Sequence, residues 1–278
     1  MATVVFGLLA AVTWGAADFG GGLASRRTPV FGVVLLSQGA GLVVAIGLVV
    51  LTRQALPAGR DLALCLIAGV VGGIGVSALY QALAVGRMGI VAPVTGVLAA
   101  VIPVGAGIVL QGLPAPIVLG GIVLAIIAVV LVSRVADEGG GGRSGLHGAV
   151  LAGIAIGFFG VVIAQIEAEP FGALTVIRTT QAVLVVGVIL ATRASWRPNP
   201  RLVPAIVAVG LLDAAGNTCY LLAVQSGALA VASVLSALYP VGTVILAAAV
   251  LRERVTRDHA IGIALAGVAV AMIGGGST

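Results

Sequence analysis

Charged residues are scarce in this chain of 278 residues. Asp, Glu, Lys and Arg make up only 8% of the sequence, whereas apolar residues make up 60%. Soluble domains carry about 25% charged residues. No soluble fold could bury so much apolar surface, so the composition excludes a soluble protein and indicates an integral membrane protein.

Lysine is missing altogether, and the net charge of +5 comes from 14 arginines. The phosphate-binding motif GxxxxGK[ST] requires a lysine, so the chain contains no ATP-binding loop of that kind. Most of the arginines lie between apolar runs, where arginine orients helices and contacts lipid headgroups. The positive charge therefore does not indicate a nucleic-acid partner.

Cysteine and histidine are also rare, with two residues of each. Cys65 and Cys219 fall inside apolar runs, where cysteine packs as a small hydrophobe more often than it forms a disulfide or binds a metal. Both histidines stand at the starts of apolar runs, and neither HExxH nor GxSxG occurs. We therefore expect no metal, no cofactor and no catalytic residues.

Long apolar runs are what the chain does contain. A helix needs about 20 apolar residues to cross a hydrocarbon layer of roughly 30 Å. Backbone in lipid must satisfy its own hydrogen bonds, which uninterrupted runs of this length do as helices. The first run lacks a basic leader, so we expect a span and not a cleaved signal peptide. The candidate spans are 3–23, 29–51, 62–85, 89–110, 117–134, 147–166, 171–191, 203–225, 229–251 and 257–275.

A glycine-rich linker, DEGGGGRSG (137–145), falls almost at the midpoint and separates residues 1–136 from residues 146–278. Because each half would hold five spans, an odd number, the second half must cross the membrane in the opposite sense to the first. The sequence thus predicts an all-α integral membrane protein of ten transmembrane helices, built as two inverted five-helix repeats around a central cavity. Many secondary transporters have inverted repeats of this kind.

Self-similarity supports the repeat. A shift of 141 residues aligns 82–133 with 223–274 without a gap, and the same shift pairs Gly69 with Gly210. Matches of glycine carry more weight than matches of Ala, Val or Leu, which are frequent by chance in apolar sequence. We expect most of these glycines to permit close helix packing.

Three stretches of the chain resemble a known family. The strongest match is the segment 236–274, SALYPVGTVILAAAVLRERVTRDHAIGIALAGVAVAMIG. It resembles the EamA-type transporters of the drug/metabolite transporter superfamily, which have a proline-centred helix, a "GER"-type turn and a "GxxLxxxGV" segment in this order. In the first half, a similar proline-containing segment is 82–98, ALAVGRMGIVAPVTGVL. The family's "WG" in the first helix resembles TWGAADF (13–19). The resemblance implies a ten-helix basket that moves small metabolites by alternating access.

One departure from the family pattern concerns the turn glutamate. Glu253 resembles it in the second half and is expected to brace the turn, whereas the first half has QGLPAPI (111–117), with Gly112 at the equivalent position. The first half therefore cannot contain the same brace. The resemblance leaves the substrate open among amino acids, sugars, nucleosides and drugs.

Polar residues inside the apolar runs are candidates for a binding site. Ionisable groups there cost about 2.5–3.5 kcal/mol and usually face a cavity or a partner. Asp213, Asn217 and Tyr220 are spaced four and three apart, which places them in one stripe on a helix. Arg178 and Gln181 lie one turn apart in the preceding run. Depths estimated from the helical rise allow a structural Arg178–Asp213 ion pair. They equally allow an Arg178 that binds a substrate carboxylate while Asp213 binds an amine or a proton.

Asp18 and Trp14 share a face of the first run because they lie four residues apart. The depth of Asp18 places it towards the opposite surface from Arg178, so a cavity aspartate and a solvated aspartate at headgroup level are both open. Asp213 or Asp18 would be the proton-coupling group. Weaker candidates for lining the cavity are Gln38, Tyr80 and Tyr239, and prolines 93, 103 and 240 are expected to kink or break helices beside it.

We predict a secondary transporter of small metabolites, driven by protons or by the substrate gradient alone. The alternatives are an intramembrane enzyme acting on a lipid-linked substrate and a non-transporting membrane scaffold. The expected partners are a small-molecule substrate, the lipid bilayer and, as one open arrangement, a second copy in a homodimer. We expect the cell membrane as its location.

Membrane orientation is left open. Loops on the side of the termini hold only Arg53 and Arg60, which places both termini outside the cytoplasm by the positive-inside rule. The family resemblance implies termini inside.

Overall fold

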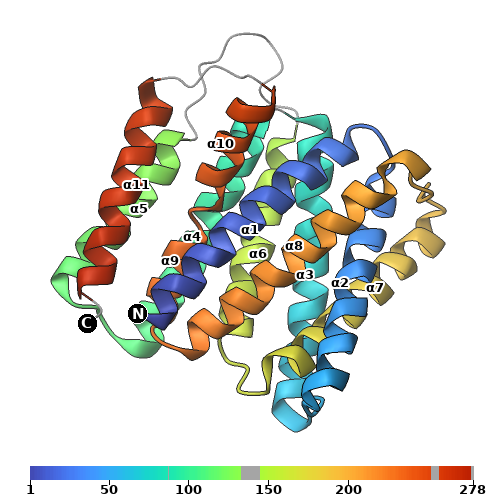
Figure 1. Ribbon diagram of the computed structural model, residues 1–278, viewed down its shortest axis with the longest axis horizontal. Coiled ribbons are helices and arrows are strands. Elements are labelled where there is room, and N and C mark those ends of the chain that lie inside the picture. Colours follow the sequence, from blue (N-terminus) through green and yellow to red (C-terminus); the bar gives the residue numbers. More distant parts are fainter. Residues whose placement is uncertain (87, 133–144, 252–256, 277–278) are drawn as a thin grey trace.

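The computed structural model describes residues 1–86, 88–132, 145–251 and 257–276, and these form a bundle of helices (Figure 1). Among these residues, seven helices are long and apolar enough to cross a membrane, which supports the predicted multi-pass α-helical membrane protein. Glu253 and most of the linker 137–145 lie outside the described residues. The helices of the first half are α1 (Ala2–Ser25), α2 (Val30–Thr52), α3 (Gly59–Val85), α4 (Met88–Gln111) and α5 (Pro116–Val132).

The second half begins with α6 (Leu146–Ile163), α7 (Pro170–Thr192) and α8 (Val203–Gln225), the last preceded by a short 3-10 turn, η1 (Pro200–Leu202). It ends with α11 (Arg257–Gly276). The start of α1 and the end of α11 lie at the same end of the bundle (Figure 1).

The predicted span 229–251 is wrong as a single helix, because it is divided into α9 (Leu229–Ser236) and α10 (Tyr239–Leu251). Pro240 has no N–H and so cannot donate to the carbonyl of Ser236, which removes a helical hydrogen bond where α9 ends. The proline was expected to break a helix here. By contrast, Pro93 and Pro103 lie inside α4, which continues through both.

Helices from the two halves pack against each other in a reciprocal way. In the first half, α1 packs on α8 and on α9–α10, and α2 packs on α7 and α8. In the second half, α6 packs on α3 and α4, and α7 packs on α2 and α3. Helices α5 and α11 pack on each other at one edge of the bundle (Figure 1).

Helices α2 and α7 are close counterparts. Each has 23 residues, and each ends at an arginine in the left-handed conformation, Arg53 with φ 56° and Arg193 with φ 53°. The two helices start and end 140 residues apart, one fewer than the shift of 141 found in the sequence. Arg178 on α7 therefore corresponds to Gln38 on α2.

The loops after these helices dock on the opposite half. A Cβ at Gly172, near the start of α7, would collide with the carbonyl oxygen of Ala55, after α2. A Cβ at Gly32, near the start of α2, would collide with the carbonyl oxygen of Trp196, after α7. Each loop thus lies directly on a glycine of the other half.

Candidate functional site

A central cavity lies where helices of both halves meet. Its empty space, including the open space at the mouth, is about 710 Å³. The walls come from α1, α3, α4 and α6 to α10. The lining residues are Trp14, Asp18, Gly72, Val76, Leu79, Ala99, Ile156, Phe159, Gly160, Gln181, Asp213, Asn217, Tyr220, Ser233, Ser236, Ala237 and Tyr239.

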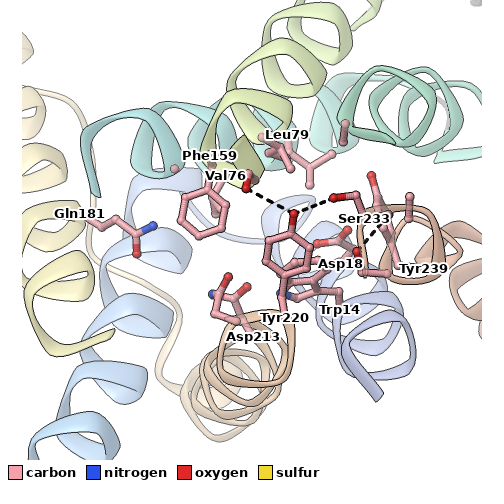
Figure 2. Close-up of a pocket in the computed structure, with 17 residues that line it drawn as sticks. Trp14, Asp18, Val76, Leu79, Phe159, Gln181, Asp213, Tyr220, Ser233 and Tyr239 are labelled. Carbon is pink, nitrogen blue, oxygen red and sulfur yellow. Dashed lines mark hydrogen bonds between the residues drawn. The ribbon is translucent and has the colours of Figure 1, made fainter. Parts of the chain in front are cut away.

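Aromatic side chains form part of the wall. The rings of Trp14 and Tyr220 lie with centroids 5.5 Å apart and planes tilted by 39°. The hydroxyl of Tyr220 is 2.9 Å from Oγ of Ser233 and donates to the carbonyl oxygen of Gly160 at 3.3 Å (Figure 2). These bonds hold one ring of the cavity in place from α6 and α9.

Glycines on neighbouring helices make room for the polar and aromatic side chains. A Cβ at Gly72 on α3 would lie 2.7 Å from Nε2 of Gln181, and a Cβ at Gly216 on α8 would collide with the indole of Trp14. Close helix packing was the role expected for most glycines in the spans. Here they also create the space that two lining side chains occupy.

An ion pair joins α7 to α8 beside the cavity. Nη1 of Arg178 lies 2.6 Å from Oδ2 of Asp213, and the same nitrogen donates to Oε1 of Gln38 on α2. The Arg178 side chain is fully buried, and the Asp213 side chain is 15% exposed. A Cβ at Gly41 on α2 would lie 3.3 Å from Nε and Cζ of the guanidinium, so this glycine leaves room for it. Arg178 therefore neutralises Asp213 from behind the cavity wall.

Asp18 projects from α1, one turn beyond Trp14, and lines the same cavity as Asp213 (Figure 2). It is partly exposed, and no cation in the described part of the chain lies within ion-pair distance of it. Of the two readings left open, the structure supports the cavity aspartate, not a headgroup-level one. Depth along the helix placed Asp18 nearer the membrane surface opposite to that of Arg178. In the structure, however, Asp18 and Asp213 share one cavity.

Most of the predicted site residues lie together. Three of them are buried beside the cavity without lining it: Gln38, Tyr80 and Arg178. Tyr80 packs on Gly21 of α1. The residues that line the cavity as predicted are Trp14, Asp18, Gln181, Asp213, Asn217, Tyr220 and Tyr239.

Several lining residues were not predicted. Ser233 and Ser236 stand three apart in an apolar run, a spacing that places both on one helix face and could have identified them. Phe159 has no such signal, because a lone phenylalanine in an apolar span is indistinguishable from a core residue.

Cys65 is buried and Cys219 partly buried, and both are free thiols. Among the described residues, no three His, Cys, Asp or Glu side chains cluster as a metal site would require. The cavity thus offers carboxylates, an amide, hydroxyls and aromatic faces for noncovalent binding of a small molecule.

Comparison with known proteins supports the resemblance. The model of the EamA-like transporter family matches residues 143–275, which confirms the predicted similarity through the second half of the chain. A solved structure titled "Crystal structure of protein" has a TM-score of 0.81 and 19% sequence identity, with 98% of each chain covered. At that identity the likeness shows the fold alone. No curated protein matches the chain.

Proposed function

We propose that this multi-pass membrane protein, whose second half matches the EamA-like transporter family, is a secondary transporter that moves small molecules by alternating access. The observation that carries the proposal is the central cavity, whose walls combine two carboxylates with aromatic and amide side chains. Such polar groups are costly inside a membrane unless they face a cavity or a partner. A passive scaffold would have no use for them.

The arrangement of helices supports two inverted repeats. The packing partners of α1 and α2 in the second half correspond to those of α6 and α7 in the first. The same correspondence between α2 and α7 holds for the left-handed arginines at which these helices end. It also holds for the two loops that dock on Gly172 and Gly32. In an inverted repeat, these two docking contacts lie at opposite membrane surfaces.

Contacts between the halves at those two ends could be made and broken in turn. On the side of the chain termini, the backbone N–H of Ala55 donates to Glu169 at 2.9 Å, and that of Phe171 donates to Gln54 at 2.9 Å. At the other end, the N–H of Asn199 donates to Thr28 at 2.8 Å. We propose that opening at either surface separates the contacts at that surface while the other set holds.

Counterflow in proteoliposomes tests the transport function. Vesicles with purified protein are loaded with a metabolite mixture, and exchange with labelled amino acids, sugars, nucleosides and amines is followed outside. We expect exchange of at least one class and none in protein-free vesicles. If no class is exchanged and the protein hydrolyses a lipid-linked substrate, the transport function is rejected in favour of the intramembrane enzyme.

A further inference from the structure

The charges of the cavity do not cancel. Asp213 is paired with Arg178, so together they contribute no net charge. Asp18 faces the same cavity, and the described residues place no cation beside it. With Asp18 ionised, the cavity therefore has one negative charge in a low-dielectric surrounding, where an uncompensated charge attracts a cation strongly.

Aromatic faces lie beside this charge. Figure 2 shows Asp18 among Trp14, Tyr220 and Tyr239, with Asp213 beyond the Tyr220 ring and Gln181 further away. Aromatic faces attract ammonium groups through the ring quadrupole, and tryptophan does so most strongly. The same rings pack well on an apolar ligand body.

Two buried polar atoms on the lining residues have no partner among the residues described. They are Oε1 of Gln181 and the hydroxyl of Tyr239, on side chains 3% and 4% exposed. Buried polar groups are nearly always hydrogen-bonded, and Figure 2 shows the Gln181 amide projecting towards the cavity. An ammonium group donates several hydrogen bonds, and both atoms can accept one.

We infer that the cavity selects organic monocations, an ammonium group on an aromatic or apolar body, and that Asp18 is the carboxylate that meets the positive charge. The inference builds on the proposed transport function by naming its substrate class. Asp213 has a different role, because it keeps the buried Arg178 neutralised while exposing one edge to the cavity.

The test is ligand-induced thermal stabilisation of the full-length purified protein. Three ligands share a phenyl ring and differ in charge: 2-phenylethylammonium, 2-phenylethanol and 3-phenylpropionate. Ligands that bind the folded state raise Tm in proportion to the logarithm of their concentration. We expect such a rise with the cation, and little or none with the alcohol or the acid. Equal stabilisation by all three, or preference for the acid, would overturn the inference.

Asp18→Asn removes the charge while nearly preserving the shape of the side chain. We expect at least about tenfold weaker cation binding, the range for loss of a hydrogen bond to a charged group. Glu167→Gln is the matched control, because it removes a carboxylate from an exposed loop. Asp18→Glu retains the charge and should retain preference for the cation. Unchanged binding in Asp18→Asn would overturn the assignment to Asp18, and the ligand series on the unmodified protein stands even if that variant misfolds.

Binding and transport can fail separately. If cations selectively stabilise the protein but no substrate shows counterflow, the proposed transport function is rejected and the proposed cation-binding site is retained. Counterflow of neutral or anionic metabolites, with no cation selectivity in binding, would remove the inference and leave the transporter.

Discussion

Two carboxylates face the same cavity from the neighbouring helices α1 and α8, and their surroundings differ. Asp213 on α8 lies 2.6 Å from a fully buried arginine, so it belongs to an ion pair that links α7 to α8. Asp18 on α1 lies beside aromatic rings, with no described cation in reach. The comparison shows that an ionisable residue in a span can either stabilise the fold or bind a ligand. Its role depends on whether a buried counter-charge already lies beside it.

Removing the Asp213 carboxylate should have the largest effect. In Asp213→Ala, Arg178 is left buried without its counter-charge, which costs about 3–5 kcal/mol. We expect a large fall in Tm or loss of folded protein, measured by thermal unfolding and size-exclusion chromatography. The double variant Arg178→Met/Asp213→Leu removes both charges and should recover most of the stability. If the double variant is no better than the single one, the ion pair does not explain the loss.

Crowding the Asp18 side of the cavity should come next. In Gly216→Ala, the new methyl group collides with the indole of Trp14, and overpacking of this kind costs about 1–3 kcal/mol. Gly39→Ala is the control, because its Cβ would meet nothing within 4 Å. We expect a lower Tm for the first variant only, together with a changed tryptophan emission. Equal Tm values would mean that Trp14 moves aside freely.

Loss of a single hydroxyl should have a smaller effect. Tyr220→Phe removes the hydrogen bonds to Ser233 and Gly160 and should cost about 0.5–1.5 kcal/mol. Tyr239→Phe is a matched comparison, since its hydroxyl has no partner in the described part of the structure. Its ligand-free Tm should hardly change, while its cation binding weakens. A similar fall in Tm for both variants would contradict this contrast.

Removing the charge of Asp18 should have the smallest effect on stability. Asp18→Asn breaks no ion pair among the described residues and nearly preserves the side-chain volume, so it neither strands a buried counter-charge nor creates a cavity. Its ligand-free Tm should match that of the unmodified protein, in contrast to Asp213→Ala. A collapse as severe as that of Asp213→Ala would show that Asp18 has a structural partner.

Local features of the sequence predict the helices well. Long apolar runs specify spans because only a helix satisfies the backbone in lipid. The single division of 229–251 could be anticipated from Pro240 but not located, because a proline can also be accommodated within a helix, as Pro103 is in α4. The count of ten spans stays a prediction beside the seven helices that meet the length and hydropathy criteria.

The site was partly predictable for a similar reason. Helical spacing places Asp213, Asn217 and Tyr220 on one face, and this face does line the cavity. Spacing within a helix cannot say which helices meet, so the convergence of Asp18 with Asp213 depended on the packing of α1 on α8. That packing depends in turn on Gly216, because a Cβ there would collide with the indole of Trp14. The sequence of α8 alone cannot reveal this contact with α1.

The contact between α1 and α8 also has a consequence for biosynthesis. Helix α1 is synthesised before α8, its main packing partner, and meets that partner only after close to two hundred further residues have been made. During that interval the face of α1 that packs on α8, with Trp14, lacks its final neighbours. The nascent first half is therefore an unfinished assembly, and completion of the cavity is a late event in the folding of this chain.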